Sequence, residues 1–332
     1  MDEDRLVDYL KENDEEKVIN LSLRPNTFDD FIGQKAVISS LRISVSAAKQ
    51  RGEPLEHVLL SGPPGLGKTS LAYCIAREMG AKVTSTSGPA IERAGDLVGI
   101  LTNLEQGDIL FIDEIHRLSR TVEEFIYPAM EGFQIDFIID KGPYAKSVKF
   151  SLKPFTLIGA TTRKGLLSSP LRGRFGLFYD FDFYTPEDLA QVAARSAQLL
   201  SVELDRESCL EIASRSRGSP RLANRLLKRV RDYSQVKAEG KINLQIVCQA
   251  LDSIRVDTLG LDELDRKYLR VLLDRYGGGP AGIESIAASL GEDKGTLEDV
   301  VEPYLLNIGF IVRTPRGRVA SGSAKTHLAV AS

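Results

Sequence analysis

The order of hydrophobic and polar positions divides the chain into stretches of different pattern. Between about residues 35 and 180, continuous apolar runs alternate with helical patterns, and examples of such runs are 57–62, 107–113 and 155–162. Runs of this kind are typical of strands in a parallel sheet that helices cover on both faces. The first stretch is therefore predicted to be an α/β domain.

The apolar runs stop after TPEDL (185–189), and two further patterns follow. Residues 186–254 read as helices only, and Ser219-Pro220 is a typical helix start, with serine as N-cap and proline in the first turn. From about residue 256, short helical segments precede FIVRTPRGRVAS, in which two short strands flank a Pro/Gly turn. Three helices followed by a hairpin are the pattern of a winged helix.

These patterns predict three domains. They are an α/β large domain over 1–184, a small all-α domain over 185–255 and a C-terminal winged-helix domain over 256–332. Residues 1–20 are acidic, and we expect them to form a mobile arm.

Composition narrows the class of protein. A net charge of −3 excludes a global basic field, so any contact with nucleic acid must be local. The three cysteines and three histidines are scattered without disulfide or zinc spacing, which favours a reducing compartment. The acidic N-terminus does not resemble a signal peptide, and no apolar run reaches membrane-spanning length. We therefore expect a cytoplasmic protein with no membrane partner.

GPPGLGKT (62–69) carries the strongest chemical signal in the chain. It matches G-x-x-x-x-G-K-[ST] between an apolar strand and a helix, where backbone amides and the helix N-terminus can hold phosphate oxygens. Lys68 would reach the β/γ-phosphates of ATP, and the Thr69 hydroxyl would bind Mg²⁺. The residues of this loop predicted to bind the nucleotide are Gly62, Gly65, Leu66, Gly67, Lys68, Thr69 and Ser70.

ILFIDEIHRL (109–118) supplies two adjacent carboxylates at the end of an apolar strand. Ligands of open α/β sheets bind at that edge. Asp113 would hold Mg²⁺ through water, and Glu114 would polarise the attacking water as a general base. This pair favours hydrolysis over simple nucleotide binding. Thr162, at the end of a third apolar strand, is a candidate contact to the γ-phosphate or the attacking water.

Arginines on two later segments have open roles. SSPLRGRFG (168–176) places Arg172 and Arg174 on the loop that leaves the last of these strands. Arg174 could form a surface ion pair of little energetic value. Alternatively, it could complete the ATP site of a neighbouring subunit, as a head-to-tail ring would allow. Arg221 could touch the γ-phosphate in its own subunit. Most of the other basic residues of 215–231 are predicted to line a solvated helix face; these residues are Arg215, Arg217, Arg225, Lys228, Arg229 and Arg231.

Together these segments resemble AAA+ ATPases, and their exact sequences resemble the RuvB family of Holliday junction branch-migration motors. The resemblance runs in order from about residue 20 to the C-terminus. The segments that carry it are 23–34, 62–72, 96–118, 158–176, 217–233 and 314–318. It implies an α/β P-loop NTPase (AAA+) large domain, an all-α lid and a C-terminal winged helix.

The resemblance also implies roles for single residues. Leu23 and Arg24 would line the adenine pocket, together with Tyr184. Arg174 would be the arginine finger that acts in trans, Thr162 the first sensor and Arg221 the second. The segment expected to contact a neighbour's nucleotide contains Glu131, Gly132 and Phe133. Gly132 and Gly173 stand where the family would have acidic residues, and Lys294 where it would have arginine.

The resemblance also implies several partners. Residues 133–152 read as a β-hairpin with a KGPY turn, and in the family such a hairpin docks RuvA. Ile138 and Ile139 would provide the apolar contact, although a plain edge hairpin is the alternative. The family works as a homohexameric ring on duplex DNA at the Holliday junction, and the resolvase RuvC joins the complex.

The last thirty residues carry the candidate DNA contact. Arg313, Arg316 and Arg318 lie on or beside a glycine–proline turn that can follow a phosphate backbone, and Lys294 is a further candidate. The expected function is that of an ATP-driven DNA translocase that pumps duplex out of the four-way junction. The alternatives are a clamp-loader or replication-initiator ATPase, and a nucleotide-switched DNA-binding adaptor.

Overall fold

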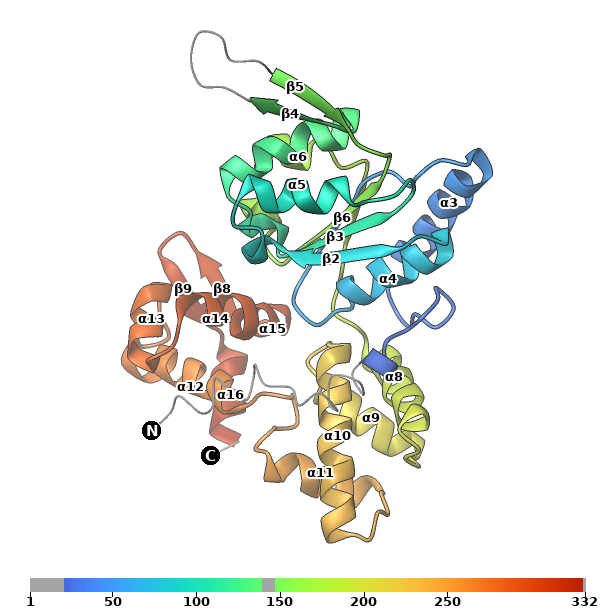
Figure 1. The fold of residues 1–332 in the computed structure, drawn as a ribbon. Helices are drawn as coiled ribbons and strands as arrows, with labels where there is room; N and C mark the ends of the chain where they lie inside the picture. Colours follow the sequence, from blue (N-terminus) through green and yellow to red (C-terminus); the bar gives the residue numbers. More distant parts are fainter. Residues whose placement is uncertain (1–20, 139–146, 331–332) are drawn as a thin grey trace.

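The computed structural model describes residues 21–138 and 147–330. Figure 1 shows them as an α/β lobe, a helical lobe and a smaller lobe that ends in a hairpin and a helix. The acidic arm expected over 1–20 lies outside the described residues. Among the described helices, none is both long and apolar enough to cross a membrane.

The α/β lobe is built on a parallel sheet. In the described residues it has five strands in the order β2-β3-β6-β1-β7. Their bounds are β1 Val58–Ser61, β2 Val83–Ser87, β3 Ile109–Asp113, β6 Thr156–Thr161 and β7 Leu177–Asp180. The three apolar runs recognised in the sequence form the central strands, so this prediction of a parallel sheet is confirmed.

Alternating side chains of the central strands point into separate cores. Leu60 and Phe111 pack in one core with α3 Lys35–Arg51 and α4 Lys68–Met79. Leu59 and Leu110 pack in the other with α5 Ala94–Thr102 and α6 Arg120–Gly132. Helices thus cover both faces, which explains why the strands read as unbroken apolar runs.

The outer strands β2 and β7 are not predicted by the sequence. β2 reads VTSTS and is only partly buried, and in β7 half-buried and exposed positions alternate. Both lie at edges of the sheet, where one face or side meets solvent. Pairing of β2 with β3, and of β7 with β1, holds these two strands in the sheet, since their own side chains do not predict a strand.

The lid consists of α8 Pro186–Leu199, α9 Arg206–Ser214, α10 Pro220–Lys237 and α11 Leu244–Ser253. Thr185, Asp205 and Asn243 cap their helices by accepting backbone N–H bonds. Ser219 occupies the N-cap position of α10 with Pro220 behind it, but its side chain does not cap the helix. Its hydroxyl donates instead to Gly65 O of the phosphate loop at 3.2 Å.

The C-terminal lobe is a winged helix, as predicted. Its helical segments are α12 Glu263–Arg270, extended by Val271–Arg275, then α13 Ile283–Leu290, α14 Lys294–Thr296, Leu297–Val301 and α15 Glu302–Asn307. The wing is the antiparallel pair β8 Ile311–Thr314 and β9 Gly317–Ala320. A closing helix that the sequence did not predict, α16 Gly322–Val330, buries Ala324 and Leu328 in the lobe's core.

A second hairpin leaves the large domain after α6. Gln134–Ile138 (β4) pairs antiparallel with Ser147–Ser151 (β5), so the predicted hairpin is confirmed. It projects away from the lid and the winged helix (Figure 1). Ile138 is the last described residue of β4, and Ile139 lies outside the described residues. Phe150 on β5 is 47% exposed.

Shorter turns complete the large domain. They are the 3₁₀ turns Gly88–Ala90, Ile115–Arg117 and Lys164–Leu166, and the helical turn α7 Ser169–Arg172.

Candidate nucleotide site and DNA-binding wing

The phosphate loop depends on glycine for its conformation. Gly62 has φ 143° and Gly65 has φ 79°, both in the region that favours glycine. A Cβ on Gly62 would lie 2.7 Å from Phe181 O, and one on Gly65 would lie 2.7 Å from Ser219 Oγ. The loop therefore packs between β7 and the lid, and only a bare backbone fits there.

Lys68 begins α4 and curls into the loop. Its Nζ donates to Gly62 O at 2.6 Å and to Pro63 O at 2.7 Å. Burial lowers the pKa of Lys68 to about 8, although the nearby Asp113 carboxylate raises it. An ammonium whose hydrogen-bond partners are neutral carbonyls, in a glycine-lined turn at a helix N-terminus, suits an anionic ligand.

Asp113 lies beside Thr69 at the carboxyl edge of the sheet. Thr69 Oγ1 donates to Asp113 Oδ2 at 3.4 Å, and Asp113 Oδ1 accepts from Glu114 N at 2.9 Å. Hydroxyl and carboxylate oxygens are the ligands that Mg²⁺ prefers, and Mg²⁺ usually needs only one or two protein ligands besides phosphate. The two residues therefore fit the predicted Mg²⁺ role.

Glu114 has an unusual backbone. Its φ of 48° places a non-glycine residue in the left-handed region. The side chain is about half exposed and pairs with Arg117 at 2.8 Å. Glu114 directly follows Asp113 at the carboxyl end of β3, the edge of the sheet at which ligands of open α/β folds bind.

The threonines at the end of β6 have different surroundings. Thr161 is buried, and its hydroxyl lies 3.0 Å from His116 Nδ1 and accepts from Arg163 N at 3.0 Å. Thr162 is the first residue beyond the strand and is partly exposed. Because β6 lies between β3 and β1, Thr162 leaves the sheet between Asp113 and the phosphate loop, where a first sensor would be expected.

The expected adenine pocket lies beside the loop. Leu23 and Tyr184 are buried, Arg24 is partly exposed, and Tyr184 Oη donates to Leu66 O at 3.2 Å. A Cβ on Gly67 would lie 3.1 Å from the ring of Phe31. Phe31 is not among the residues predicted for this pocket, although it belongs to the segment DDFIGQ that carried the resemblance.

The lid contacts the loop directly. Arg221 N donates to Gly65 O at 3.3 Å, and the same oxygen accepts the Ser219 hydroxyl. A Cβ on Gly65 would lie 3.1 Å from Arg221 Cβ. The residue expected as second sensor is therefore within reach of the phosphate site.

Arg174 lies on the side of α6 and α7. Its Nη2 pairs with Glu131 at 3.1 Å, its Nη1 donates to Pro170 O at 2.7 Å, and its Cζ is 4.4 Å from the centre of the Tyr127 ring. Gly132 and Phe133 follow Glu131 at the C-terminal end of α6. An acidic partner thus exists within the chain, and Tyr127 is a support that sequence reasoning missed.

Two arginines expected on a solvated helix face are in fact buried. Arg215 bonds to Glu211, Asp252 and the carbonyl of Val256. Arg217 bonds to the winged-helix residues Asp262 and Asp265. The prediction of a solvated face was wrong for these two positions, because acidic residues neutralise them. Glu211 lies four positions before Arg215, and the other acidic partners are distant in sequence.

The wing arginines differ in their surroundings. Arg313 and Arg318 both bond to Glu302, a carboxylate with 0% exposure, and Arg318 also pairs with Glu298. Arg316 is exposed at the turn. Lys294, before the wing, is exposed and pairs with Glu284 at 2.6 Å. Arg316 is thus the wing arginine best placed for a phosphate, whereas Arg318 is mainly occupied within the fold.

Three family models match: the Holliday junction DNA helicase RuvB P-loop domain over 23–181, the RuvB AAA lid domain over 184–257 and the RuvB C-terminal winged-helix domain over 258–329. The solved Thermotoga maritima RuvB Holliday junction branch migration motor is 50% identical, with a TM-score of 0.86, and the match covers 93% of this chain and 98% of that one. A variant of that protein matches with 50% identity and a TM-score of 0.87 over 92% of this chain and 98% of that one.

Proposed function

The chain belongs to the RuvB family, and from that premise we propose that it is an ATP-driven motor that moves Holliday junctions by pumping duplex DNA. It is a P-loop AAA+ ATPase with a lid and a winged helix. The observation that carries the proposal is the direct bonding of the lid to the phosphate loop through Gly65 O. A change at the nucleotide therefore reaches the lid without an intermediate.

The nucleotide chemistry is assigned to residues at one edge of the sheet. Lys68 would exchange its carbonyl partners for β/γ-phosphate oxygens. Thr69 and Asp113 would hold Mg²⁺, which neutralises phosphate charge when bound. Glu114 would take the proton of the attacking water once it turns from Arg117, and Thr162 would orient that water.

Arg174 is proposed to act on the neighbouring subunit. In the single chain its guanidinium rests on Glu131 and Tyr127, which keeps it on the flank formed by α6 and α7. In a homohexameric ring this flank would face the next phosphate site, with Glu131, Gly132 and Phe133 beside the neighbour's nucleotide. A finger of this kind contributes about 10³–10⁵-fold to turnover.

The lid and the winged helix are assigned the mechanical step. Arg221 would sense the γ-phosphate, and its loss would rotate the lid. The winged helix would carry the duplex, with Arg316 on phosphate and with Arg313, Arg318 and Lys294 as weaker candidates because each is paired to an acid. The proposed domain boundaries are 1–184, 185–255 and 256–332.

The partners follow from the family. DNA and RuvA are the expected partners of a RuvB motor, and we assign RuvA to the β4–β5 hairpin, around Ile138 and Ile139. RuvC as a third component and the hexameric ring remain proposals at the same level. The clamp-loader and adaptor alternatives are not favoured, because the lid and winged-helix models that match are those of RuvB.

Branch migration of a synthetic four-way junction with RuvA tests the motor. The wild-type protein should move the junction only with hydrolysable ATP. Arg174→Ala and Lys68→Ala should each fail alone, and mixing them should restore part of the turnover, because a site intact in one subunit meets a finger intact in the other. A mixture that restores nothing would exclude action across subunits.

A further inference from the structure

The winged helix is joined to the rest of the molecule at two places of different character. The first is the contact with the lid through Arg217. This side chain is buried, and its Nη2 lies 2.5 Å from Asp262 and 2.6 Å from Asp265, a residue with 0% exposure. Its Nε donates to Gly260 O at 2.7 Å. Separating these groups would leave unpaired charges in the interior, which is costly. The lid and the winged helix therefore form one body.

The second place is the contact with the large domain through Arg163. This residue follows β6, and its Nε lies 2.6 Å from Asp299, while its Nη1 lies 3.3 Å from Glu298. The hydrogen bond to Asp299 raises the pKa of Arg163, so the guanidinium is charged throughout. All three side chains are partly exposed, at 29%, 34% and 22% for Arg163, Asp299 and Glu298. Water can replace such a contact at little cost, so it can open and close.

Arg163 is connected to the phosphate loop by a short path. Its backbone N–H donates to Thr161 Oγ1, and the carbonyl of Thr161 accepts from Gly62 N at 3.2 Å. Thr161 Oγ1 also lies 3.0 Å from His116, two positions after Glu114. Arg163 is thus attached to a strand end that bonds to the phosphate loop and to His116, in the turn that follows Glu114.

The acidic side of this contact reaches the wing. Glu298 pairs with Arg163 on one side and with Arg318 of β9 at 3.3 Å on the other. Arg318 is in turn fixed to Glu302. The path from Gly62 to the base of the wing therefore runs through three side chains, those of Thr161, Arg163 and Glu298.

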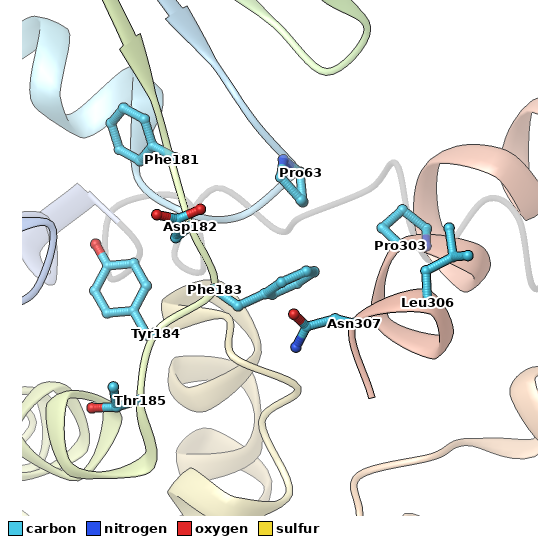
Figure 2. A pocket seen from close by; sticks show the side chains of 9 residues that line it. All are labelled: Pro63, Phe181, Asp182, Phe183, Tyr184, Thr185, Pro303, Leu306 and Asn307. Atoms are coloured by element: carbon cyan, nitrogen blue, oxygen red, sulfur yellow. The ribbon is translucent and has the colours of Figure 1, made fainter. Parts of the chain in front are cut away.

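A further contact of the winged helix near this seam is aromatic and borders an open cleft. Figure 2 shows Phe183 directed toward the helix of Pro303 and Asn307, while Tyr184 points the other way. Phe183 meets Tyr304 edge-on at 6.2 Å, and beside them lies a cavity of about 660 Å³ between the 181–185 linker and α15. At this open cleft the two sides are not packed tightly against each other.

We propose that Arg163, Glu298 and Asp299 form a latch that couples the nucleotide site to the DNA-binding wing. The latch opens and closes with the nucleotide state, and the lid and winged helix, joined by Arg217, move as one body when it opens. Arg163 acts as a positioning residue through the strand end and touches no reacting atom. The proposal rests on the proposed motor function, which supplies the movement to be coupled.

Charge reversal tests the latch. Asp299→Arg and Arg163→Asp each set like charges against one another at positions 163 and 299, and the double variant restores attraction between these two positions. With full-length protein, RuvA and a four-way junction, each single variant should keep DNA-free ATP turnover within about twofold. Base pairs migrated per ATP should fall at least about threefold in each single variant and recover in the double variant. The matched control is Lys164→Asp, which breaks the neighbouring ion pair with Asp180 inside the large domain and should leave the ratio unchanged.

A second measurement separates the latch from the motor function. Fluorophores on the large domain and the winged helix should report a distance that differs between ADP and a non-hydrolysable ATP analogue in the wild type. The single variants should lose that difference, and the double variant should regain it. Wild-type coupling in both single variants, or a double variant that fails to recover, would overturn the latch. A wild type that moves no junction would overturn the motor function, while the distance would still test the latch.

Discussion

The phosphate loop and the wing both present basic side chains, but they use them differently. Lys68 lies in a turn whose carbonyls are its hydrogen-bond partners. Arg313 and Arg318 instead converge on Glu302, which also accepts from Tyr268 Oη at 2.8 Å. The first cation is poised for a ligand, whereas the other two satisfy a buried carboxylate.

This difference gives a criterion for deciding whether a basic motif binds an anionic ligand. A charge that the fold has already neutralised stabilises the domain, and it contributes to a ligand only if its partner releases it. The phosphate loop meets this criterion, and in the wing the exposed Arg316 meets it best. The comparison can be tested by removing charges from each region and measuring catalysis, stability and affinity separately.

The largest effect is expected from Lys68→Ala. ATP turnover should fall by about 10³-fold, or about 4 kcal/mol, because the charge that faces the phosphates in the transition state is lost. Thermal stability should not fall, since the side chain is buried at a cost to its charged form. Steady-state ATPase assays and thermal unfolding measure the two quantities. A large loss of stability would show that Lys68 has a structural role, like Arg313 and Arg318 in the wing.

Glu302→Ala should produce the opposite result. Removing the buried carboxylate leaves Arg313, Arg318 and the Tyr268 hydroxyl without their partner, which should destabilise the winged helix by about 3 kcal/mol. ATP turnover without DNA should be retained. Hydrogen exchange over residues 297–320 reports the change locally. Glu284→Ala, which removes the exposed partner of Lys294, is the matched control and should leave exchange unaltered.

The pH dependence of nucleotide binding is the third test. With a pKa of about 8 in the free protein, Lys68 is charged below pH 8 and becomes neutral above it. Burial of the charged Lys68 side chain destabilises the folded protein below pH 8. This cost disappears as the pH rises from about 8 toward the ordinary lysine pKa of 10.5, so the nucleotide-free protein gains stability over that range. Phosphate needs the ammonium, and affinity for ADP should therefore drop about tenfold between pH 7 and pH 9. Calorimetry measures this change. Lys68→Arg should show no such decline.

The smallest effect is expected from Arg316→Ala. Duplex affinity should decrease a few-fold for unrelated sequences alike, and the slope of log affinity against log salt should fall by about one. Fluorescence anisotropy with two duplexes measures both. Arg318→Ala should instead lower the stability of the winged helix, because the buried Glu302 loses one of its two arginine partners. If the Arg316 variant loses affinity for only one duplex, the contact reads bases and a sequence-neutral motor is excluded.

The nucleotide site could be predicted from the sequence because its signals are local. GPPGLGKT needs its glycines within eight residues, and Asp113 follows directly on an apolar strand. The strand order then brings both to one edge, as parallel sheets require. The edge strands β2 and β7 escaped because their side chains are partly exposed, and pairing with a neighbour determines their structure.

The arginines escaped for a different reason. Arg217 and its partner Asp265 are 48 positions apart, and no local sequence pattern near either residue predicts their pairing. Glu302 is likewise separated from Arg318 by sixteen positions and a turn. Sequence patterns report which side chains are charged, whereas the pairing of those charges is a property of the folded chain. Ser219 illustrates the same point, since its hydroxyl bonds to the loop instead of its own helix.

The hydrogen bonds from Ser219 and Arg221 to Gly65 O have a consequence for a motor under load. If nucleotide binding changes the free energy of lid rotation, then a force that rotates the lid must change the free energy of nucleotide binding by the same amount. A subunit whose lid is pulled by its cargo should therefore hold ATP and ADP with altered strength. Tension in the DNA would then alter the rate at which ADP is released.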